Sequence, residues 1–140
     1  MSTVKVDTIQ TTGGVSEIAI DKLKGVSAAS SISVVAEGGT TTTNLQQGVA
    51  KAWTNVSADG ATVNDSFNNT SITDTGTGIQ TVNHANDFSN ANYSCHLTIG
   101  GDVSKVWINN QAAGSFDGRV YTGSAYSDQI QRHTSHGDLA

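Results

Sequence analysis

Residues 93–99 read Tyr-Ser-Cys-His-Leu-Thr-Ile, and this stretch has the clearest two-residue alternation in the chain. Tyr93, Cys95, Leu97 and Ile99 fall on one side of an extended backbone, and the polar residues between them fall on the other. Such alternation is typical of a β-strand with one side against a core and the other toward solvent. We therefore expect a half-buried strand at 93–99, with its apolar side facing the core.

Similar short segments, separated by turn residues, lie on both sides of this strand. The turn sequences are Asp59-Gly60, Gly76-Thr77-Gly78, Asn90-Ala91-Asn92, Gly100-Gly101 and Asp117-Gly118. Asp-Gly and Gly-Gly pairs supply the positive φ angles that tight hairpins require. We expect strands near residues 51–56, 62–68, 71–75, 78–84, 93–99, 103–109, 118–122 and 128–135. Short strands at this spacing predict a mainly β protein with a C-terminal antiparallel β-sandwich.

The N-terminal part of the chain has a different character. Residues 2–43 contain no aromatic residue, and their short apolar segments cannot bury enough surface for a core of their own. We therefore expect an extended N-terminal arm over residues 1–43, ordered by neighbouring copies or by a host structure; the alternative is a flexible leader. The remaining unit, residues 44–140, comprises a short neck and the sandwich.

Residues 44–53 are the best candidate for a helix in the neck. Leu45, Val49 and Trp53 are spaced at four residues and form one apolar stripe, and Thr43 or Asn44 can cap the first turn. The alternative is that residues 51–56 already belong to the first strand of the sandwich. Within the sandwich we expect Trp53, Phe67 and Tyr93 to lie in the core.

Composition argues against several classes of function. Lys and Arg total 7 against 12 for Asp and Glu, so the formal charge is −5 and no basic surface for nucleic acid is expected. No apolar run is long enough for insertion into a membrane or for a signal peptide. Cys95 is the single cysteine, which excludes a disulfide within the chain and a zinc site made of cysteines. We expect no cofactor.

A series of fragments from residue 51 onward has a recognisable order. These fragments are Lys51-Ala52-Trp53, Asp65-Ser66-Phe67-Asn68, Ser71-Ile72-Thr73-Asp74, Gly76-Thr77-Gly78, Thr81-Val82-Asn83, Asn90-Ala91-Asn92-Tyr93 and the terminal His136-Gly137-Asp138-Leu139-Ala140. In this order they resemble small tail-fibre-like virion proteins of tailed bacteriophages, especially phages of marine bacteria and cyanobacteria. The resemblance covers roughly residues 40–140, and residues 3–14 resemble the leader of such proteins.

This resemblance implies a structural protein of the virion and not an enzyme. It implies a homotrimer that is assembled in the host cytoplasm and becomes a tail or head appendage. The N-terminal arm would dock on other phage virion proteins, and the C-terminal domain would contact a glycan or protein on the host surface. The sequence departs from the family pattern at its last strand, because residues 129–136 contain one apolar residue, Ile130. Either this strand is not buried, or a neighbouring subunit closes the sheet edge there.

The receptor contacts are expected in the C-terminal third, where aromatic and amide side chains cluster. A ring can stack on a sugar face while amides bind its hydroxyl groups. The candidates are Trp107, Asn109, Asn110, Phe116, Tyr121 and Tyr126. In the alternative, Trp107 fills the core and the tyrosines line contacts between subunits. Phe116 and Tyr126 are expected in loops.

Four histidines raise the possibility of a metal site. His133 and His136 would form rings of imidazoles around a threefold axis, and Zn²⁺ or Fe²⁺ accepts such ligands. Positions three apart on a strand point to opposite sides, however, so we expect two solvated histidines and no metal. His84 and His96 have no neighbouring ligands in the sequence and are expected at the surface or on a sheet face.

Catalysis is not expected. No Gly-X-Ser-X-Gly sequence marks a nucleophilic serine. Asp65, Asp74 and Asp102 could in principle supply a carboxylate pair for glycoside cleavage, but we interpret them as solvated residues. Asp117 is interpreted as a turn former beside Gly118. Two further functions stay open: a capsid decoration or head-fibre protein that cements the capsid, and a carbohydrate-binding module or small lysis enzyme.

Overall fold

The structure is a computed structural model that describes residues 20–24, 32–36, 38–60, 62–101 and 105–140. Its elements, in chain order, are β1 (Ser33–Val35), β2 (Thr42–Asn44), α1 (Leu45–Gly48), β3 (Ala52–Val56), β4 (Val63–Phe67), β5 (Asn69–Gly76), β6 (Ile79–His84), β7 (Ser94–Ile99), β8 (Lys105–Ala112), β9 (Ser115–Tyr121) and β10 (Gln131–His136). Much of the expected arm, including the leader at residues 3–14, lies outside the described residues.

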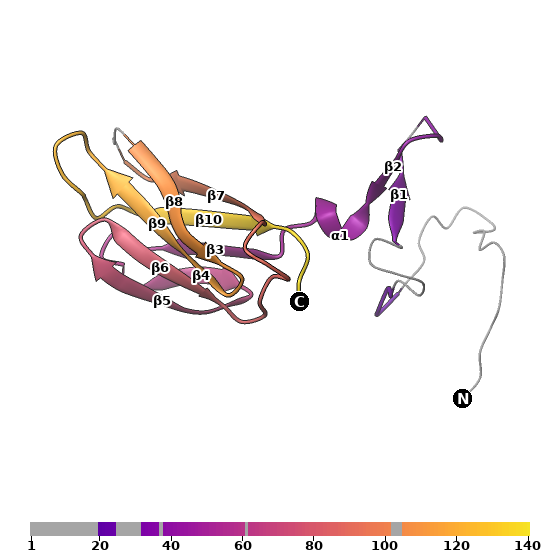
Figure 1. Ribbon diagram of the computed structural model, residues 1–140, viewed down its shortest axis with the longest axis horizontal. Helices are drawn as coiled ribbons and strands as arrows, with labels where there is room; N and C mark the ends of the chain where they lie inside the picture. The colour runs from indigo at the N-terminus through magenta and orange to yellow at the C-terminus, as the bar shows by residue number, and fades with distance from the viewer. Residues whose placement is uncertain (1–19, 25–31, 37, 61, 102–104) are drawn as a thin grey trace.

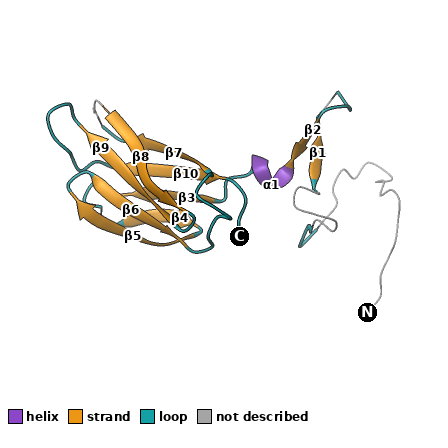
Figure 2. Cartoon of the chain, in the orientation of Figure 1, coloured by secondary structure: helices purple, strands orange, loops and turns teal. Residues whose placement is uncertain are grey.

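Two four-stranded antiparallel sheets form a sandwich (Figures 1 and 2). Strands follow the order β4-β3-β10-β7 in the first sheet and β5-β6-β9-β8 in the second. Each of the eight expected sandwich strands is present, with small shifts at the ends. The mainly β prediction and the antiparallel sandwich are therefore confirmed.

The chain crosses from the first sheet to the second between β4 and β5. Asn68 makes this corner with a φ of 57°, a conformation that Asn tolerates better than most residues. Its side chain accepts a hydrogen bond from the backbone N–H of Asn86 at 2.8 Å and donates one to the Asn86 carbonyl at 3.1 Å. The Asn68 side chain thus ties the corner between the sheets to the backbone of Asn86.

Strand β7 follows the alternation expected for residues 93–99. Tyr93 is buried and Cys95, Leu97 and Ile99 are half-buried, whereas the polar residues between them are exposed. The prediction for this stretch is confirmed.

The space between the sheets has an apolar part and a polar part. Val82, Phe88, Tyr93 and Phe116 form the apolar cluster, in which the Phe88 and Tyr93 rings stack with centroids 3.9 Å apart. Beside it lie buried polar side chains from both sheets: Thr54, Gln80, Gln131, His133 and Ser135. The core therefore contains residue types that sequence patterns usually assign to the surface.

The last strand differs from its expectation. β10 is neither exposed nor an edge, because it pairs with β3 on one side and with β7 on the other. Gln131, His133 and Ser135 point inward and are at most 3% exposed. A central position satisfies every backbone group of the strand, so the strand is retained although its inward side chains are polar.

Two further expectations about burial are wrong, and a third is correct only in part. Trp53 and Phe67 are not in the core but exposed on the outer side of the first sheet. His84 lies on a sheet face and not at the surface, because it is on the inner side of β6, where its ring packs against Phe88 at 5.1 Å and is buried. In each case the strand was expected, but a polar or aromatic residue on a strand does not by itself reveal which side faces the core.

The neck helix is one turn long. Asn44 caps α1, and its side-chain oxygen accepts from the Gln47 backbone N–H at 2.9 Å. The helix ends at Gly48, so Val49 and Trp53 are not part of it, and the expected stripe does not form. The alternative, in which residues 51–56 begin the sandwich, is nearer to the structure. None of the described helices is long and apolar enough to cross a membrane.

Candidate functional site

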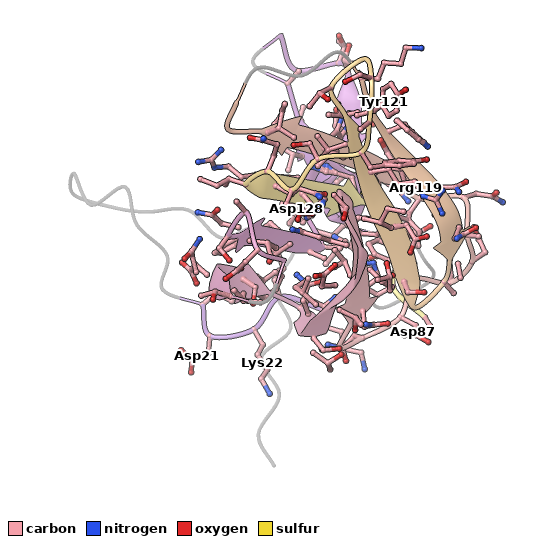
Figure 3. The ribbon with its side chains drawn as sticks, turned by 90° about the vertical axis from the view of Figure 1, so that its left-hand side faces the viewer. Asp21, Lys22, Asp87, Arg119, Tyr121 and Asp128 are labelled. Carbon is pink, nitrogen blue, oxygen red and sulfur yellow. The ribbon has the colours of Figure 1, made fainter. Side chains whose placement is uncertain are left out.

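The outer side of the second sheet gathers the aromatic residues of the C-terminal third. Strands β8 and β9 pair so that Trp107 lies opposite Arg119, and Lys105 lies opposite Tyr121. Directly paired residues of an antiparallel sheet point to the same side. Figure 3 shows Arg119 and Tyr121 along β9 on this side of the molecule. We call this surface the aromatic face.

A loop after β9 places a third ring on the aromatic face. The Thr122 backbone N–H donates to the Ala125 carbonyl at 2.9 Å, and Tyr126 forms a bridge with Tyr121. The Tyr126 ring lies 5.9 Å from Trp107 and 5.6 Å from Tyr121, edge-on to the latter. These are favourable separations for aromatic pairs, so the three rings hold one another in place.

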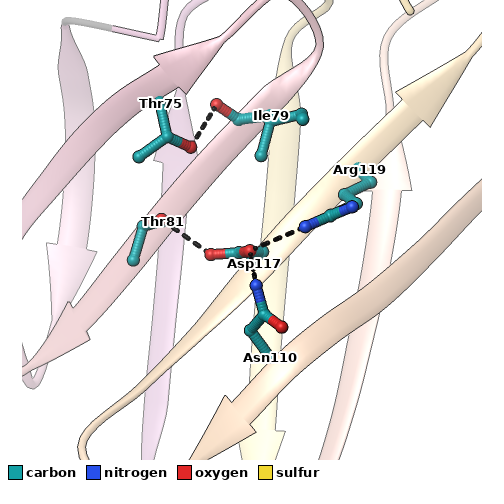
Figure 4. A network of polar contacts seen from close by, with 6 residues as sticks. All are labelled: Thr75, Ile79, Thr81, Asn110, Asp117 and Arg119. Carbon is teal, nitrogen blue, oxygen red and sulfur yellow. Dashed lines mark hydrogen bonds and ion pairs between the residues drawn. The ribbon is translucent and has the colours of Figure 1, made fainter.

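A polar network lies beside the rings and is centred on Asp117 (Figure 4). One carboxylate oxygen accepts from the Thr81 hydroxyl at 2.7 Å, and the other accepts from the Asn110 amide at 2.6 Å and from Arg119 at 3.2 Å. The donors come from β6, β8 and β9. One buried carboxylate therefore connects three neighbouring strands.

The network holds Asp117 and Arg119 in their charged states. Burial alone would raise the pKa of Asp117, but hydrogen bonds from Thr81, Arg119 and Asn110 outweigh it and hold that pKa below its ordinary value. The hydrogen bond to Asp117 in turn raises the pKa of Arg119, and Tyr126 adds to this effect. Arg119 is thus a fixed cation between the carboxylate and the aromatic rings.

Asn110 reaches Asp117 because the backbone of β8 is irregular at this point. The pairing of β8 with β9 shifts between Asn109 and Ala112, and Asn110 has a φ of 47°. Bulges of this kind redirect side chains, often next to functional sites. Asn109 and Asn110 are both exposed at the margin of the aromatic face.

Five of the six expected contact residues lie on the aromatic face. Trp107, Asn109, Asn110, Tyr121 and Tyr126 come together there, although they are spread over 20 residues of sequence. Trp107 and Tyr121 are half-buried and Tyr126 is 38% exposed.

Phe116 is the exception, and its assignment is corrected. It was expected in a loop, but it lies in β9 with its ring inward and 1% exposed, 5.2 Å from the His133 ring. Strand alternation explains this: Asp117, Arg119 and Tyr121 point outward, so Phe116 points to the core.

Sequence reasoning missed Asp117 and Arg119. Asp117-Gly118 was expected to form a turn, but both residues lie within β9 and are buried. The signal that could have found them is the two-residue spacing of Asp117, Arg119 and Tyr121, which places a carboxylate, a guanidinium and a ring on one side of a strand.

The two histidines of the metal alternative point to opposite sides of their strand. His133 points into the core and His136 to the opposite side of β10, as expected for positions three apart. His133 is therefore buried and not solvated as we expected. In the described ranges no group of three or more His, Cys, Asp or Glu side chains could hold a metal ion.

The carboxylates considered for glycoside cleavage are separated. Asp65 lies on β4 of the first sheet and Asp74 on β5 of the second, and Asp102 is outside the described residues. A polar depression of about 170 Å³ lies elsewhere, where Gln47 of the neck meets Asp138 and the turn at residues 89–92. None of the expected contact residues lines it.

Comparisons of the chain with protein-family models, with curated proteins and with solved structures find no match in any of the three.

Proposed function

We propose that this chain is a tail-fibre-like appendage protein of a bacteriophage virion, which binds a glycan on the host surface through its aromatic face. The resemblance described above supports the virion assignment. The observation that carries the binding site is the convergence of Trp107, Tyr121 and Tyr126 beside the Asp117–Arg119 pair.

The chemistry of the aromatic face suits a sugar ligand. The apolar face of a sugar ring stacks on an aromatic ring, and its hydroxyl groups need donors and acceptors around that ring. Asn109, Asn110 and Lys105 are exposed at the margin of the rings and provide both kinds of group. Because the rings and Arg119 are already held in place, little ordering is needed on binding.

The position of the aromatic face agrees with an adhesive role. The hairpin β1–β2 and the neck lie at one end of the sandwich, and the connection from β9 to β10, which carries Tyr126, lies at the other (Figure 1). In the proposed appendage the arm attaches to other virion proteins, the chain forms a trimer, and the far end meets the host.

The experiment measures binding of soluble, monovalent fragments of the host surface polysaccharide to the purified full chain by calorimetry. Trp107→Ala should weaken binding at least tenfold, which corresponds to about 1.4 kcal/mol. Trp53→Ala is the matched control, since Trp53 is exposed on the outer side of the other sheet. Equal affinity of the wild type and a folded Trp107→Ala variant would show that the aromatic face is not the binding site.

The position on the particle needs a separate measurement. Immunogold labelling of virions with an antibody against this chain should mark the tail. Label on the head would instead favour the capsid decoration or head-fibre function, in which the arm interlocks between capsid subunits.

A further inference from the structure

The exposed large hydrophobic side chains are concentrated in the first half of the sequence. Ten are exposed among the described residues, and eight of them lie between residues 20 and 67: Ile20, Leu23, Val34, Val35, Val49, Trp53, Val63 and Phe67. The other two are Tyr126, on the aromatic face, and Leu139. Single exposed hydrophobic residues are ordinary, whereas neighbouring ones mark a candidate interaction surface, and two such sets lie within this range of the sequence.

The first member of this group is an aromatic pair on the sandwich. Trp53 of β3 lies directly opposite Phe67 of β4, so both point to the outer side of the first sheet. Trp53 is 37% exposed and Phe67 54%. Val49 precedes the pair in the neck and is also exposed. We call Trp53 and Phe67 the aromatic pair.

The second member is the hairpin β1–β2. Val34 and Val35 are consecutive residues of β1, so they point to opposite sides of the hairpin, and both are exposed. A two-stranded hairpin is marginal in water without a surface to pack against. Its described backbone hydrogen bonds outside the β1–β2 pairing stay within residues 32–45. Neither side of the hairpin is covered by its own sandwich.

The neck holds the hairpin away from the aromatic pair of the same chain. Asn44 caps α1, and the Gln47 side chain donates to Asp138 at 2.5 Å, which ties the helix to the C-terminal segment. The Lys51 backbone N–H donates to the Ser135 carbonyl at 2.8 Å, which fixes the start of the sandwich. Figure 1 shows the hairpin beyond α1, separate from both sheets. In the part of the chain that the structure describes, the hairpin and the aromatic pair are thus two exposed apolar surfaces that do not meet within one molecule.

We propose that the chain self-associates by hairpin exchange, in which the hairpin β1–β2 of one copy packs on the aromatic pair of a second copy. Each copy gives one hairpin and receives one, so the contact is heterologous and closes into a ring when the rotation between copies permits. This proposal rests on the trimer of the proposed function and names the contact between its copies. It does not depend on receptor binding.

The test compares the native mass of full-length variants at equal concentration by light scattering or native mass spectrometry. The wild type should be an oligomer. Val34→Ser with Val35→Ser, and separately Trp53→Ser with Phe67→Ser, should reduce the mass to that of the monomer. Tyr126→Ser is the matched control, because it removes an exposed ring from the connection between β9 and β10 and should leave the mass unchanged. The hairpin variant lies outside the sandwich, so its result does not depend on stability of the sandwich.

Cross-linking identifies the contact itself. A chain with Val34→Cys and Phe67→Cys should form covalent oligomers under mild oxidation, whereas Val34→Cys with Tyr126→Cys should not. Cys95 should not compete, because it is half-buried and burial raises the pKa of its thiol to about 11.

Two results would overturn hairpin exchange. If the wild type is a monomer, the hairpin packs on another surface, such as a virion protein. If the wild type is an oligomer but both double variants keep its mass, the copies associate elsewhere. Neither result bears on the glycan site, which the calorimetric comparison of Trp107→Ala tests separately.

Discussion

Gly118 of β9 faces the polar part of the core, directly below two side chains of β10. The Nε2 atom of His133 lies 3.2 Å from the Oε1 atom of Gln131, and both side chains are buried. A methyl group on residue 118 would overlap Gln131 Oε1 and lie 2.6 Å from His133 Nε2. The absence of a side chain on β9 thus makes room for two polar ones from the opposite sheet.

We expect Gly118→Ala to destabilise the sandwich. The two atoms that the methyl group meets belong to enclosed side chains, so the sheets must shift to admit it, at a cost of about 1–3 kcal/mol. The measurement is the free energy of unfolding in urea. Gly48→Ala is the control, since a methyl group there meets nothing within 4 Å. An unchanged stability of Gly118→Ala would mean that the polar part of the core is loosely packed.

Stability should fall between about pH 6.5 and pH 4 because of His133. Burial lowers the pKa of His133 from 6.5 to about 4 in the folded chain. Above pH 6.5 both states are neutral and the full stability is present. Between the two values the unfolded chain binds a proton that the folded chain does not, so stability decreases as the pH falls, by about 3 kcal/mol in total.

Unfolding in urea at a series of pH values checks this expectation. His133→Gln should flatten the dependence, whereas His96→Gln, on the exposed side of β7, should keep it. A residual slope is expected from His84, because burial lowers its pKa as well, against a smaller opposing effect of Asp87. If His133→Gln has the same slope as the wild type, His133 is not buried in solution.

At the scale of elements, β8 and β9 show how one side chain organises a surface. Asp117 accepts hydrogen bonds from β6, β8 and β9 and has a side chain that is 10% exposed. It therefore links the strands that carry Trp107 and Tyr121 and binds Arg119, which lies opposite Trp107. The pairing of the strands places the rings. The hydrogen bonds of Asp117 hold these strands and the Arg119 side chain in position.

Asp117→Asn should weaken both folding and ligand binding. The variant keeps the shape of the side chain but removes the charge that pairs with Arg119, and one donor of the network loses its acceptor. A loss of about 1–3 kcal/mol in the free energy of unfolding is expected. Asp65→Asn is the matched control, because Asp65 is exposed and its recorded side-chain bond is to the adjacent Ser66 N–H. Equal losses in the two variants would argue against a network that supports the aromatic face.

At the scale of the whole molecule, the proposed functions of adhesion and assembly fall on different ends of the sandwich. The connection after β9, which carries Tyr126, lies at one end, whereas the hairpin β1–β2 and the neck lie at the other. In an assembled appendage several aromatic faces would act together, since linked sites bind a surface far more tightly than each site alone.

The Val34→Ser and Val35→Ser double variant should separate affinity from avidity. Its affinity for a soluble monovalent glycan should equal that of the wild type, because the hairpin is remote from the aromatic face. On a surface coated with the same glycan, its apparent affinity should fall by about 10²–10⁴. Surface plasmon resonance in both formats measures the difference. A loss in solution as well would show that the hairpin takes part in the site.

Much of the fold and part of the site could be predicted from the sequence. The alternation in residues 93–99 predicted β7, and the turn residues at 59–60 and 76–78 marked true connections. Trp107, Tyr121 and Tyr126 were expected to act together, and they do share a face. Burial was harder to predict: Trp53 and Phe67 are exposed, whereas Phe116, His84 and His133 are enclosed.

The sequence by itself determined the number of sandwich strands and most of their turns, though not the course of β9 through Asp117 and Gly118, because alternation and turn chemistry act between residues that are close along the chain. Only the tertiary structure decided which strand is central and which side of it is inward, since these depend on pairing between segments far apart. β10 shows the difference, because its residues have a weak apolar pattern. It is nevertheless a central strand, paired with β3 and β7, and its inward side chains Gln131 and His133 pack against Gly118. Backbone pairing on both sides and room for polar side chains outweigh the hydrophobicity that the strand lacks.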